Sequence, residues 1–456
     1  MQVRSQSMDW SPSSWQAKEA LQQPVYEDEG QLRAICEHLS SVPPLVTSWE
    51  AKSLQRQLAE AAHGRRFLLQ GGDCAERFDE CRVDIIANRL KVLLQMSLAL
   101  VYGLKLPVVR VGRFAGQYAK PRSSGMETRG DVSLPSYRGD IINGPAFTEA
   151  DRTPDPQRLI QAHSYSALVL NYVRALSDSG FANLKHPEQW NLEFVHQSPW
   201  AQEYRRMVSE IQEAIQFMET VSNVDADSLG RVDFYTSHEA LHLHYEEAFT
   251  RGVPGAAPHY NLSTHMPWIG MRTAQPGGAH VEYARGIANP LGLKVGPAMS
   301  PSMLRTLIQT LNPDNTPGRL TLIHRFGVHQ IETLLPPLLE VVRAEGADVL
   351  WCCDPMHGNT ETTDQGIKTR HFDKILGELE HAFDIHAAEG TILGGVHLEL
   401  TGEDVTECIG GARGLEEADL QRAYTSHVDP RLNYEQALEM TFCIVRKRRR
   451  SLREGQ

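Results

Sequence analysis

The stretch Phe67-Leu-Leu-Gln-Gly-Gly-Asp-Cys-Ala-Glu76 begins as an apolar run of strand length and ends in glycines and polar residues. Similar short apolar runs recur along the chain between longer helical or loop segments, beginning at Val108, Val232, Tyr260, Leu291, Leu320, Asp348 and Gly395. Apolar runs of this length that alternate with helices are typical of parallel βα units. Eight runs permit closure of the sheet, so we predict an α/β protein with a (β/α)8 TIM barrel.

The regions outside these runs suggest two additions to the barrel. Residues 1–60 form an N-terminal arm and a helix, in which Leu54, Leu58 and Ala62 keep helical spacing. Residues 61–456 form the catalytic barrel, interrupted between its second and third strands by a helical insertion at residues 149–230. Two apolar stripes predict two helices in this insertion: Tyr165, Leu168, Tyr172 and Leu176 in one, Met207, Ile211, Ile215 and Met218 in the other. They either pack only on the barrel or on a second subunit, or they form a regulatory or oligomer-forming element.

Composition excludes several classes of protein. The 456 residues are 41% hydrophobic and 22% charged, as in globular proteins, and a net charge of -12 argues against generic nucleic-acid binding. Seven cysteines without a Cys-x-x-Cys frame do not form a disulfide scaffold. Neither a secretory signal nor a membrane span is expected, because Lys105 interrupts the apolar stretch Leu98–Val109. We therefore expect a cytoplasmic protein, of bacterial origin, without nucleic-acid or membrane partners; the basic run Arg446–Arg450 is expected to be a solvated helix end.

One motif points to a different chemistry. His238-Glu-Ala-Leu-His242 matches H-E-x-x-H, which on a helix places two imidazoles on zinc. The motif directly follows a predicted strand, and no third ligand stands at the metzincin spacing. A zinc metalloprotease is therefore a remote alternative. His238 and Glu239, at the end of a predicted barrel strand, are left as candidates for another site, whereas His242 and His244 are expected to be ordinary helix histidines.

Two sets of polar residues follow the predicted strands, where barrel enzymes place their active sites. The first set holds the metal-ligand types Cys74, His357, Glu399 and Asp429. A thiolate, an imidazole and carboxylates together suit a borderline divalent ion such as manganese, cobalt, iron or zinc better than calcium. The second set holds cations that suit phosphate and carboxylate groups: Arg113, Lys120, Arg122, Arg272, Lys294 and Arg325. So many cations indicate two anionic substrates, whereas Cys352 and Cys353, inside a predicted strand, are explained by packing.

Longer motifs give the chain a family resemblance. They are Gly71-Gly-Asp-Cys-Ala-Glu, Gly116-Gln-Tyr-Ala-Lys-Pro-Arg-Ser, Trp268-Ile-Gly-x-Arg-Thr, Lys294-Val-Gly-Pro, Asp354-Pro-Met-His-Gly-Asn-Thr, Lys368-Thr-Arg-His-Phe, Thr401-Gly-Glu-Asp-Val-Thr-Glu-Cys and Asp429-Pro-Arg-Leu-Asn. Over essentially its whole length the chain resembles the class II, plant-type 3-deoxy-D-arabino-heptulosonate 7-phosphate (DAHP) synthases. The resemblance implies a barrel transferase that condenses phosphoenolpyruvate with D-erythrose 4-phosphate and releases phosphate, as the first step of the shikimate pathway to chorismate and the aromatic amino acids.

The resemblance also assigns residues position by position. It implies metal ligation by Cys74, His357, Glu399 and Asp429; phosphoenolpyruvate binding by Arg113, Met271, Arg272, Lys294 and Arg325; and erythrose 4-phosphate binding by Lys120, Arg122 and Ser123. We expect Mn²⁺ or Co²⁺, with Zn²⁺, Fe²⁺ or Mg²⁺ as alternatives, to polarise the aldehyde of the sugar phosphate. The catalysis is thus metal-centred, and the sequence does not identify the residue that activates water.

Departures from the family pattern leave other readings open. Met271 stands where the family usually has an acidic residue, and Val428 stands where many relatives have cysteine. A paralogue of specialised metabolism, using the same acceptor or an amino-sugar phosphate, is the main alternative. A chain that has lost activity and serves as a binding partner is another, although the expected ligands and cations are retained. The insertion resembles that of feedback-regulated members, so aromatic amino acid effectors and a homodimer or homotetramer are expected.

Overall fold

The computed structural model describes residues 10–178, 201–222, 233–252 and 258–454, with side chains as far as residue 214 in the second of these ranges and residue 449 in the last. Its centre is a curled sheet of eight parallel strands in the order β5-β2-β1-β14-β11-β10-β9-β8. The strands are β1 (Phe67–Gly72), β2 (Val108–Arg113), β5 (Tyr235–Thr236), β8 (Trp268–Ile269), β9 (Leu291–Val295), β10 (Leu320–His324), β11 (Val349–Cys353) and β14 (Leu393–Glu399). The predicted α/β class and parallel sheet are confirmed.

The two outer strands of the sheet approach each other at one point. Glu239, just after β5, forms an isolated parallel bridge with Trp268 of β8. The Trp268 N–H donates to the carbonyl of His238 over 3.0 Å, and the Ala240 N–H donates to the carbonyl of Trp268 over 3.0 Å. The curled sheet is therefore linked edge to edge beside the ends of β5 and β8.

Seven of the eight predicted apolar runs overlap strands of this sheet, and one prediction was wrong. The run at Tyr260 belongs to β7 (His259–Asn261), which pairs antiparallel with β6 (Thr250–Gly252) outside the main sheet. The strand that occupies the expected place is β8, which has two residues and is too short to produce an apolar run. Of the run at Val232, only Tyr235 lies in a strand, and Val232 is outside the described residues.

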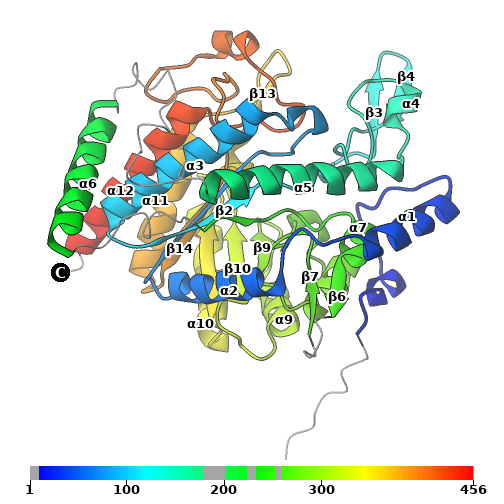
Figure 1. Ribbon diagram of the computed structural model, residues 1–456, viewed down its shortest axis with the longest axis horizontal. Coiled ribbons are helices and arrows are strands. Elements are labelled where there is room, and N and C mark those ends of the chain that lie inside the picture. Colours follow the sequence, from blue (N-terminus) through cyan, green and yellow to red (C-terminus); the bar gives the residue numbers. More distant parts are fainter. Residues whose placement is uncertain (1–9, 179–200, 223–232, 253–257, 455–456) are drawn as a thin grey trace, which may run out of the picture.

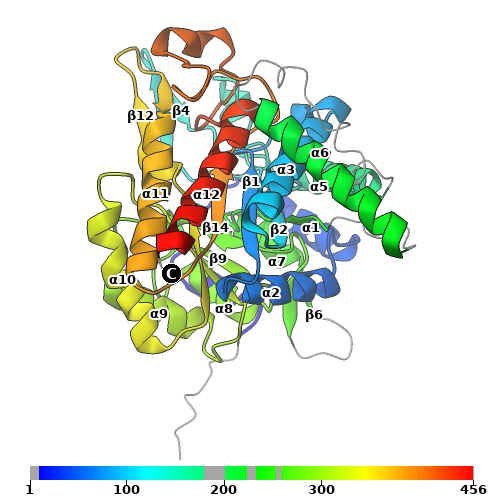
Figure 2. The same ribbon diagram turned by 90° about the vertical axis from the view of Figure 1, so that its left-hand side faces the viewer.

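Helices surround the sheet (Figures 1 and 2). Their bounds are α1 (Glu29–Ser41), α2 (Ser48–Ala62), α3 (Val83–Leu104), α4 (Glu149–Arg152), α5 (Gln157–Asp178), α6 (Ala201–Ser222), α7 (Leu243–Ala248), α8 (Ala279–Gly286), α9 (Pro301–Leu311), α10 (Ile331–Glu345), α11 (Phe372–Ala388) and α12 (Tyr434–Glu454). The 3-10 helices are η1 (Ser14–Ala17), η2 (Phe78–Glu80), η6 (Met271–Thr273), η7 (His357–Asn359) and η8 (Glu417–Arg422). Two hairpins complete the list: β3 (Met126–Arg129) with β4 (Val132–Pro135), and β12 (Thr360–Thr362) with β13 (Lys368–Arg370).

Helix α2 closes the lower end of the sheet, as Figure 1 shows. Leu54 and Leu58 are fully buried, as their spacing predicted, and they join a cluster with inward-facing strand residues such as Leu68, Val109 and Cys352. Thr47 and Glu50 form a capping box that begins the helix. The interior is therefore apolar at this end, and the polar strand ends lie at the other.

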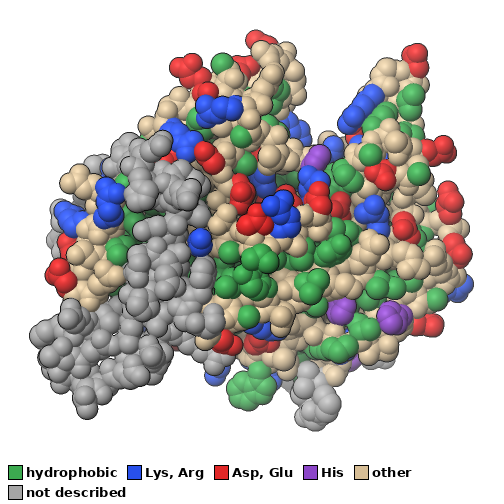
Figure 3. Space-filling view, turned by 45° about the horizontal axis from the view of Figure 1, so that its top comes forward, with side chains coloured by type: hydrophobic (Ala, Val, Ile, Leu, Met, Phe, Trp, Pro, Cys, Tyr) green, Lys and Arg blue, Asp and Glu red, His purple; other side chains and the backbone are tan. Residues whose placement is uncertain are grey.

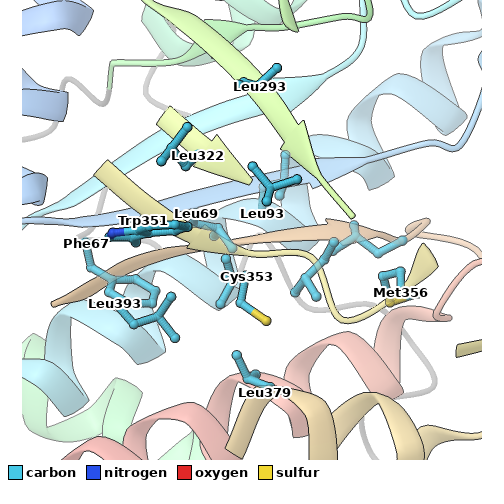
Figure 4. Packing of buried hydrophobic residues seen from close by; sticks show 14 of the residues in the cluster. Phe67, Leu69, Leu93, Leu293, Leu322, Trp351, Cys353, Met356, Leu379 and Leu393 are labelled. Carbon is cyan, nitrogen blue, oxygen red and sulfur yellow. The ribbon is translucent and has the colours of Figure 1, made fainter. Parts of the chain in front are cut away.

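The outer face of the sheet packs against the helices. Leu379 of α11 faces strand β11, which carries Trp351 and Cys353 (Figure 4). Cys352 and Cys353 are both fully buried in apolar clusters, which confirms their packing role. Helix α3 is long and apolar enough to cross a membrane, but 67% of its most apolar window is buried inside the protein, as expected for a core helix.

The two predicted insertion helices are present as α5 and α6, and both contact α3. The predicted stripe on α5 was wrong only at Leu168, which is 58% exposed, whereas Tyr165, Tyr172 and Leu176 are partly buried and pack against the core. The buried side of α5 carries Leu159, Ala162, Ser166, Val169, Leu170 and Val173. On α6 Met207 is buried, whereas the side chains of Ile215 and Met218 lie outside the described residues. The contacts with α3 fit the interpretation in which the helices pack on the barrel.

Candidate active site

A cavity of about 230 Å³ opens at the carboxyl ends of the strands. The space-filling view shows a hollow with basic, acidic and histidine side chains gathered in it (Figure 3). The strand register places Arg113 and Glu399 at the same level of the sheet, since Gly72 of β1 pairs with both Arg113 of β2 and Glu399 of β14. The cavity is lined by Cys74, Arg113, Gln117, Lys120, Pro121, Glu239, Trp268, Gly270, Met271, Arg272, Lys294, Arg325, His357, Thr360, Lys368 and Asp429. Most residues predicted from the sequence thus face one cavity.

Three of the four predicted metal ligands form a tight group. The thiol of Cys74 and the carboxylates of Glu399 and Asp429 have ligand atoms within 4.8 Å of one another. Burial, together with the charge of Glu399, raises the pKa of the Cys74 thiol to about 12. Val428 packs in the same apolar cluster as Cys74.

His357 lies beside this group and is oriented by a neighbour. Its Nδ1 is 2.7 Å from Asp354 Oδ2, and its Nε2 is 3.0 Å from Glu399 Oε1. Donation from Nδ1 to a carboxylate is how metal-binding histidines are commonly fixed, because it leaves the Nε2 lone pair free. Burial alone would raise the pKa of Asp354, but the charges of His357 and Lys294 hold it well below its usual value.

Lys120 joins the two predicted sets of residues. Its ammonium lies 2.5 Å from Cys74 Sγ, 2.6 Å from Asp429 Oδ2 and 3.8 Å from Glu399 Oε1. Burial would lower the pKa of Lys120, but the charges of Asp429 and Cys74 raise it above the ordinary lysine value. The ammonium of Lys120 therefore lies among the predicted metal ligands. The sequence instead predicted that Lys120 binds the sugar phosphate together with Arg122 and Ser123.

The donor set fits a divalent transition metal. Fully buried Arg370 also donates to Glu399 Oε2 over 2.8 Å. Burial alone would raise the pKa of Glu399, but the charges of His357, Lys120 and Arg370 hold it well below its usual range. A thiol, an imidazole and two carboxylates provide the mixture of soft and hard donors that borderline ions prefer. The histidine and Glu399 are each held by further polar neighbours, as in metal sites whose ligands are positioned in advance.

Four predicted cations surround the rest of the cavity. Arg113 is anchored by the carbonyl of Asp73 at 2.9 Å, by Glu399 Oε1 at 2.9 Å and by His397 Nε2. Lys294 pairs with the buried Asp354, and Arg325 donates to the carbonyl of His357. Arg272 is exposed at the mouth of the cavity.

Met271 lies against one of these cations. Its sulfur is 3.2 Å from Arg325 Nη1, and a Cβ added at Gly296 would overlap it. The position that is acidic in the family pattern therefore presents an apolar side chain to the cavity wall.

Arg122 and Ser123 do not line the cavity, although Lys120 and Pro121 just before them do. They belong to the segment that runs from the end of β2 towards the β3–β4 hairpin. Gln22 of the N-terminal arm accepts a hydrogen bond from the Arg122 N–H over 3.0 Å.

Glu239 is a cavity residue to which the sequence assigned no role of its own. It lies after β5, and its Oε1 has no hydrogen-bond partner within the described parts of the chain. Burial raises the pKa of Glu239 to about 6, although Lys120, Lys294, Arg113 and Arg272 oppose the shift. Gly270 is required beside it, because a Cβ at that position would overlap the carboxylate. Lys368 and Arg370 were also missed as site residues, although their motif was noted.

The H-E-x-x-H motif does not form a zinc site. Residues 238–242 are not helical, and His242 is the N-cap of α7. His238 Nε2 contacts Glu246 over 2.8 Å, whereas His242 Nε2 contacts Tyr26 over 2.7 Å. Only His244 is a helix histidine, so the prediction for His242 was wrong. The protease alternative fails because the two imidazoles have separate partners.

Known proteins resemble the chain over nearly its full length. Residues 10–445 match the sequence profile of the Class-II DAHP synthetase family. A Phospho-2-dehydro-3-deoxyheptonate aldolase of Neurospora crassa is 46% identical over 461 residues, covering 98% of this chain and 95% of that protein. An enzyme of the same name from Streptomyces coelicolor is 46% identical over 445 residues, covering 98% and 99% respectively.

Proposed function

The chain belongs to the class-II DAHP synthetase family, and on that premise we propose that it is an enzyme that condenses phosphoenolpyruvate with D-erythrose 4-phosphate to give DAHP and phosphate. This is the entry reaction of the shikimate pathway. The observation that carries the proposal is the cluster of Cys74, Glu399 and Asp429 beside convergent cations in one cavity.

The finer architecture is part of the proposal. The bridge between Glu239 and Trp268 supports closure of the curled sheet into a (β/α)8 barrel. Residues 1–60 would be an added arm and helix, residues 61–456 the catalytic unit, and residues 149–230 an insertion within it. The long motifs support the plant-type subgroup.

Cys74, His357, Glu399 and Asp429 would hold a divalent ion, with Mn²⁺ or Co²⁺ preferred over Zn²⁺, Fe²⁺ or Mg²⁺. When bound, the ion supplies Lewis-acid polarisation of the aldehyde of the sugar phosphate. Lys120 lies among the same acceptors and would have to move from them. Its ammonium would then be available to an anionic group of the substrate, as the sequence predicted.

Arg113, Arg272, Lys294 and Arg325 would bind the phosphate and carboxylate of phosphoenolpyruvate. Each charge-assisted hydrogen bond contributes roughly 1.5–3 kcal/mol. Arg113 and Lys294 are buried and already paired, so they are positioned before substrate arrives. Lys120, Arg122 and Ser123 would bind erythrose 4-phosphate.

The proposed reaction proceeds in three steps, in which a side chain of this protein accepts the proton from water. The C2–C3 double bond of phosphoenolpyruvate breaks as C3 bonds to the aldehyde carbon, and the aldehyde oxygen takes a proton from solvent. The cationic C2 then accepts a water oxygen. We assign Glu239 as the base that takes the proton from this water, because its Oε1 has no hydrogen-bond partner among the described residues, and because it lines the cavity beside cations. Cleavage of the bond between C2 and the phosphate oxygen releases phosphate, the C2 hydroxyl gives its proton to the departing phosphate, and the keto group remains.

Met271 keeps the second candidate function open. An apolar side chain at Arg325 changes the cavity wall, so a specialised enzyme with an amino-sugar phosphate acceptor remains the alternative. Aromatic amino acid effectors at the insertion, a homodimer or homotetramer and a cytoplasmic location are further proposals. The relatives include a fungal and a bacterial protein, so their similarity does not select a bacterial origin.

The test is phosphate release with either acceptor. With phosphoenolpyruvate and Mn²⁺, erythrose 4-phosphate should support release, and the amino-sugar phosphate should not. Release only with the amino-sugar phosphate would favour the specialised reaction. Release with neither acceptor would refute both.

A further inference from the structure

An amide of the N-terminal arm holds the backbone of a distant cavity loop. The Arg122 N–H donates to Gln22 Oε1 over 3.0 Å, and Gln22 Nε2 donates back to the Arg122 carbonyl over 3.1 Å. Both polar atoms of one side chain thus pair with both backbone groups of one residue. The two residues are 100 positions apart in the sequence.

Arg138 extends this contact to Lys120. Its Nη2 donates to the Gln22 carbonyl over 2.6 Å and to Gln22 Oε1 over 3.2 Å. The Arg138 carbonyl in turn accepts from the Lys120 N–H over 2.9 Å. The arm is therefore connected to the backbone on both sides of Pro121.

The arm itself is fixed from the opposite direction. Gln23 donates to the Leu241 carbonyl over 2.6 Å and accepts from the Leu243 N–H over 3.0 Å, in the segment that follows Glu239. Gln22 has a φ of 60°, a left-handed conformation that a residue with a side chain rarely adopts. Such a conformation persists only where its surroundings hold it, and here they orient the amide towards Arg122.

We propose that Gln22 is a positioning residue that fixes the backbone from which Lys120, Arg122 and Ser123 extend, and so sets the affinity for the sugar phosphate. The inference rests on the proposed function, in which these residues bind erythrose 4-phosphate. The N-terminal arm then contributes to binding of the sugar phosphate, although its sequence contains no motif that predicts a binding or catalytic role.

The test separates KM from kcat in the full-length Mn²⁺ enzyme. Gln22→Ala should raise KM for erythrose 4-phosphate about tenfold, as expected when one charge-assisted contact between this loop and the sugar phosphate is lost. The values of kcat and of KM for phosphoenolpyruvate should stay within about twofold of the wild type. Gln22→Gly should show the same defect, because glycine accepts the positive φ but lacks the amide. Gln16→Ala, in the same arm but bonded to Glu247, should leave all constants unchanged.

A double-mutant cycle with Arg122→Ala shows whether Gln22 acts through that residue. Arg122→Ala should raise KM for the sugar phosphate, and adding Gln22→Ala should then raise it by a smaller factor than Gln22→Ala does in the wild-type protein. Wild-type KM in both Gln22 variants, or an equal loss in every constant with a lower Tm, would overturn the inference. An unchanged KM in Arg122→Ala would instead refute the proposed role of Arg122, which separates the two failures.

Discussion

Replacing Glu239 by glutamine should lower kcat and abolish the decrease of kcat at low pH, which is called the acid limb of the pH–rate profile below. Glutamine keeps the shape beside Gly270 but cannot accept a proton from water. A positioned general base contributes about 10²–10⁴-fold to a rate, so kcat should fall by roughly that factor at pH 7.5. Because burial raises the pKa of Glu239 to about 6, the base form is about 90% populated at pH 7 and about 10% at pH 5. Wild-type kcat should therefore decrease as the pH falls through about 6.

The assay is phosphate release at saturating substrates from pH 5 to 8.5, with Mn²⁺ held at saturation at each pH. Glu247→Gln is the matched control, because Glu247 lies on α7 outside the cavity and binds Trp15 and Gln16 instead. The control should keep both the rate and the acid limb. A Glu239→Gln enzyme with a wild-type rate, or with the acid limb intact, would refute the assignment of the base.

Three further changes probe the rest of the site. Glu407→Gln should raise the Kd for Mn²⁺ about tenfold. Glu407 pairs with Arg431, which also pairs with Asp73 next to the ligand Cys74. An unchanged Kd in an electron paramagnetic resonance titration would contradict this. Lys294→Met should raise KM for phosphoenolpyruvate by about one to two decades, while the exposed control Lys52→Met should not; equal KM values in steady-state kinetics would exclude a direct role for Lys294. Met271→Leu should change kcat/KM by less than about threefold, because it preserves an apolar side chain of similar volume; a larger loss would give the sulfur, which contacts Arg325, a function of its own.

The sequence predicted the central strands because they are long enough to leave a pattern. Strands β1, β2 and β14 have six or seven residues and contain short apolar runs. Strands β2 and β14 end in the site residues Arg113 and Glu399, and β1 ends two residues before Cys74. Strand β8 has only two residues, so no apolar run could locate it. Strand β5 also has two residues, and the run predicted at Val232 overlaps it only at Tyr235. The strand predicted at Tyr260 failed because a local hairpin uses the same residue types.

The same distinction holds for the site. Cys74 and Glu399 could be found because the end of a parallel strand is a place that sequence can predict. Glu239 lies inside a motif that suggests zinc, and its place in the cavity follows from the fold, which brings it beside Gly270. The contact between Gln22 and Arg122 depends on how the arm crosses the barrel, which no local pattern encodes.

The most direct test of the account is phosphate release by chelator-treated protein supplied with phosphoenolpyruvate and erythrose 4-phosphate, before and after Mn²⁺ is added. We predict activity only after Mn²⁺ addition, and none in Cys74→Ser or His357→Ala at the same Mn²⁺ concentration. Full activity of the chelated wild-type protein, or wild-type rates in both variants, would contradict the claim that this cavity is a metal-dependent condensation site.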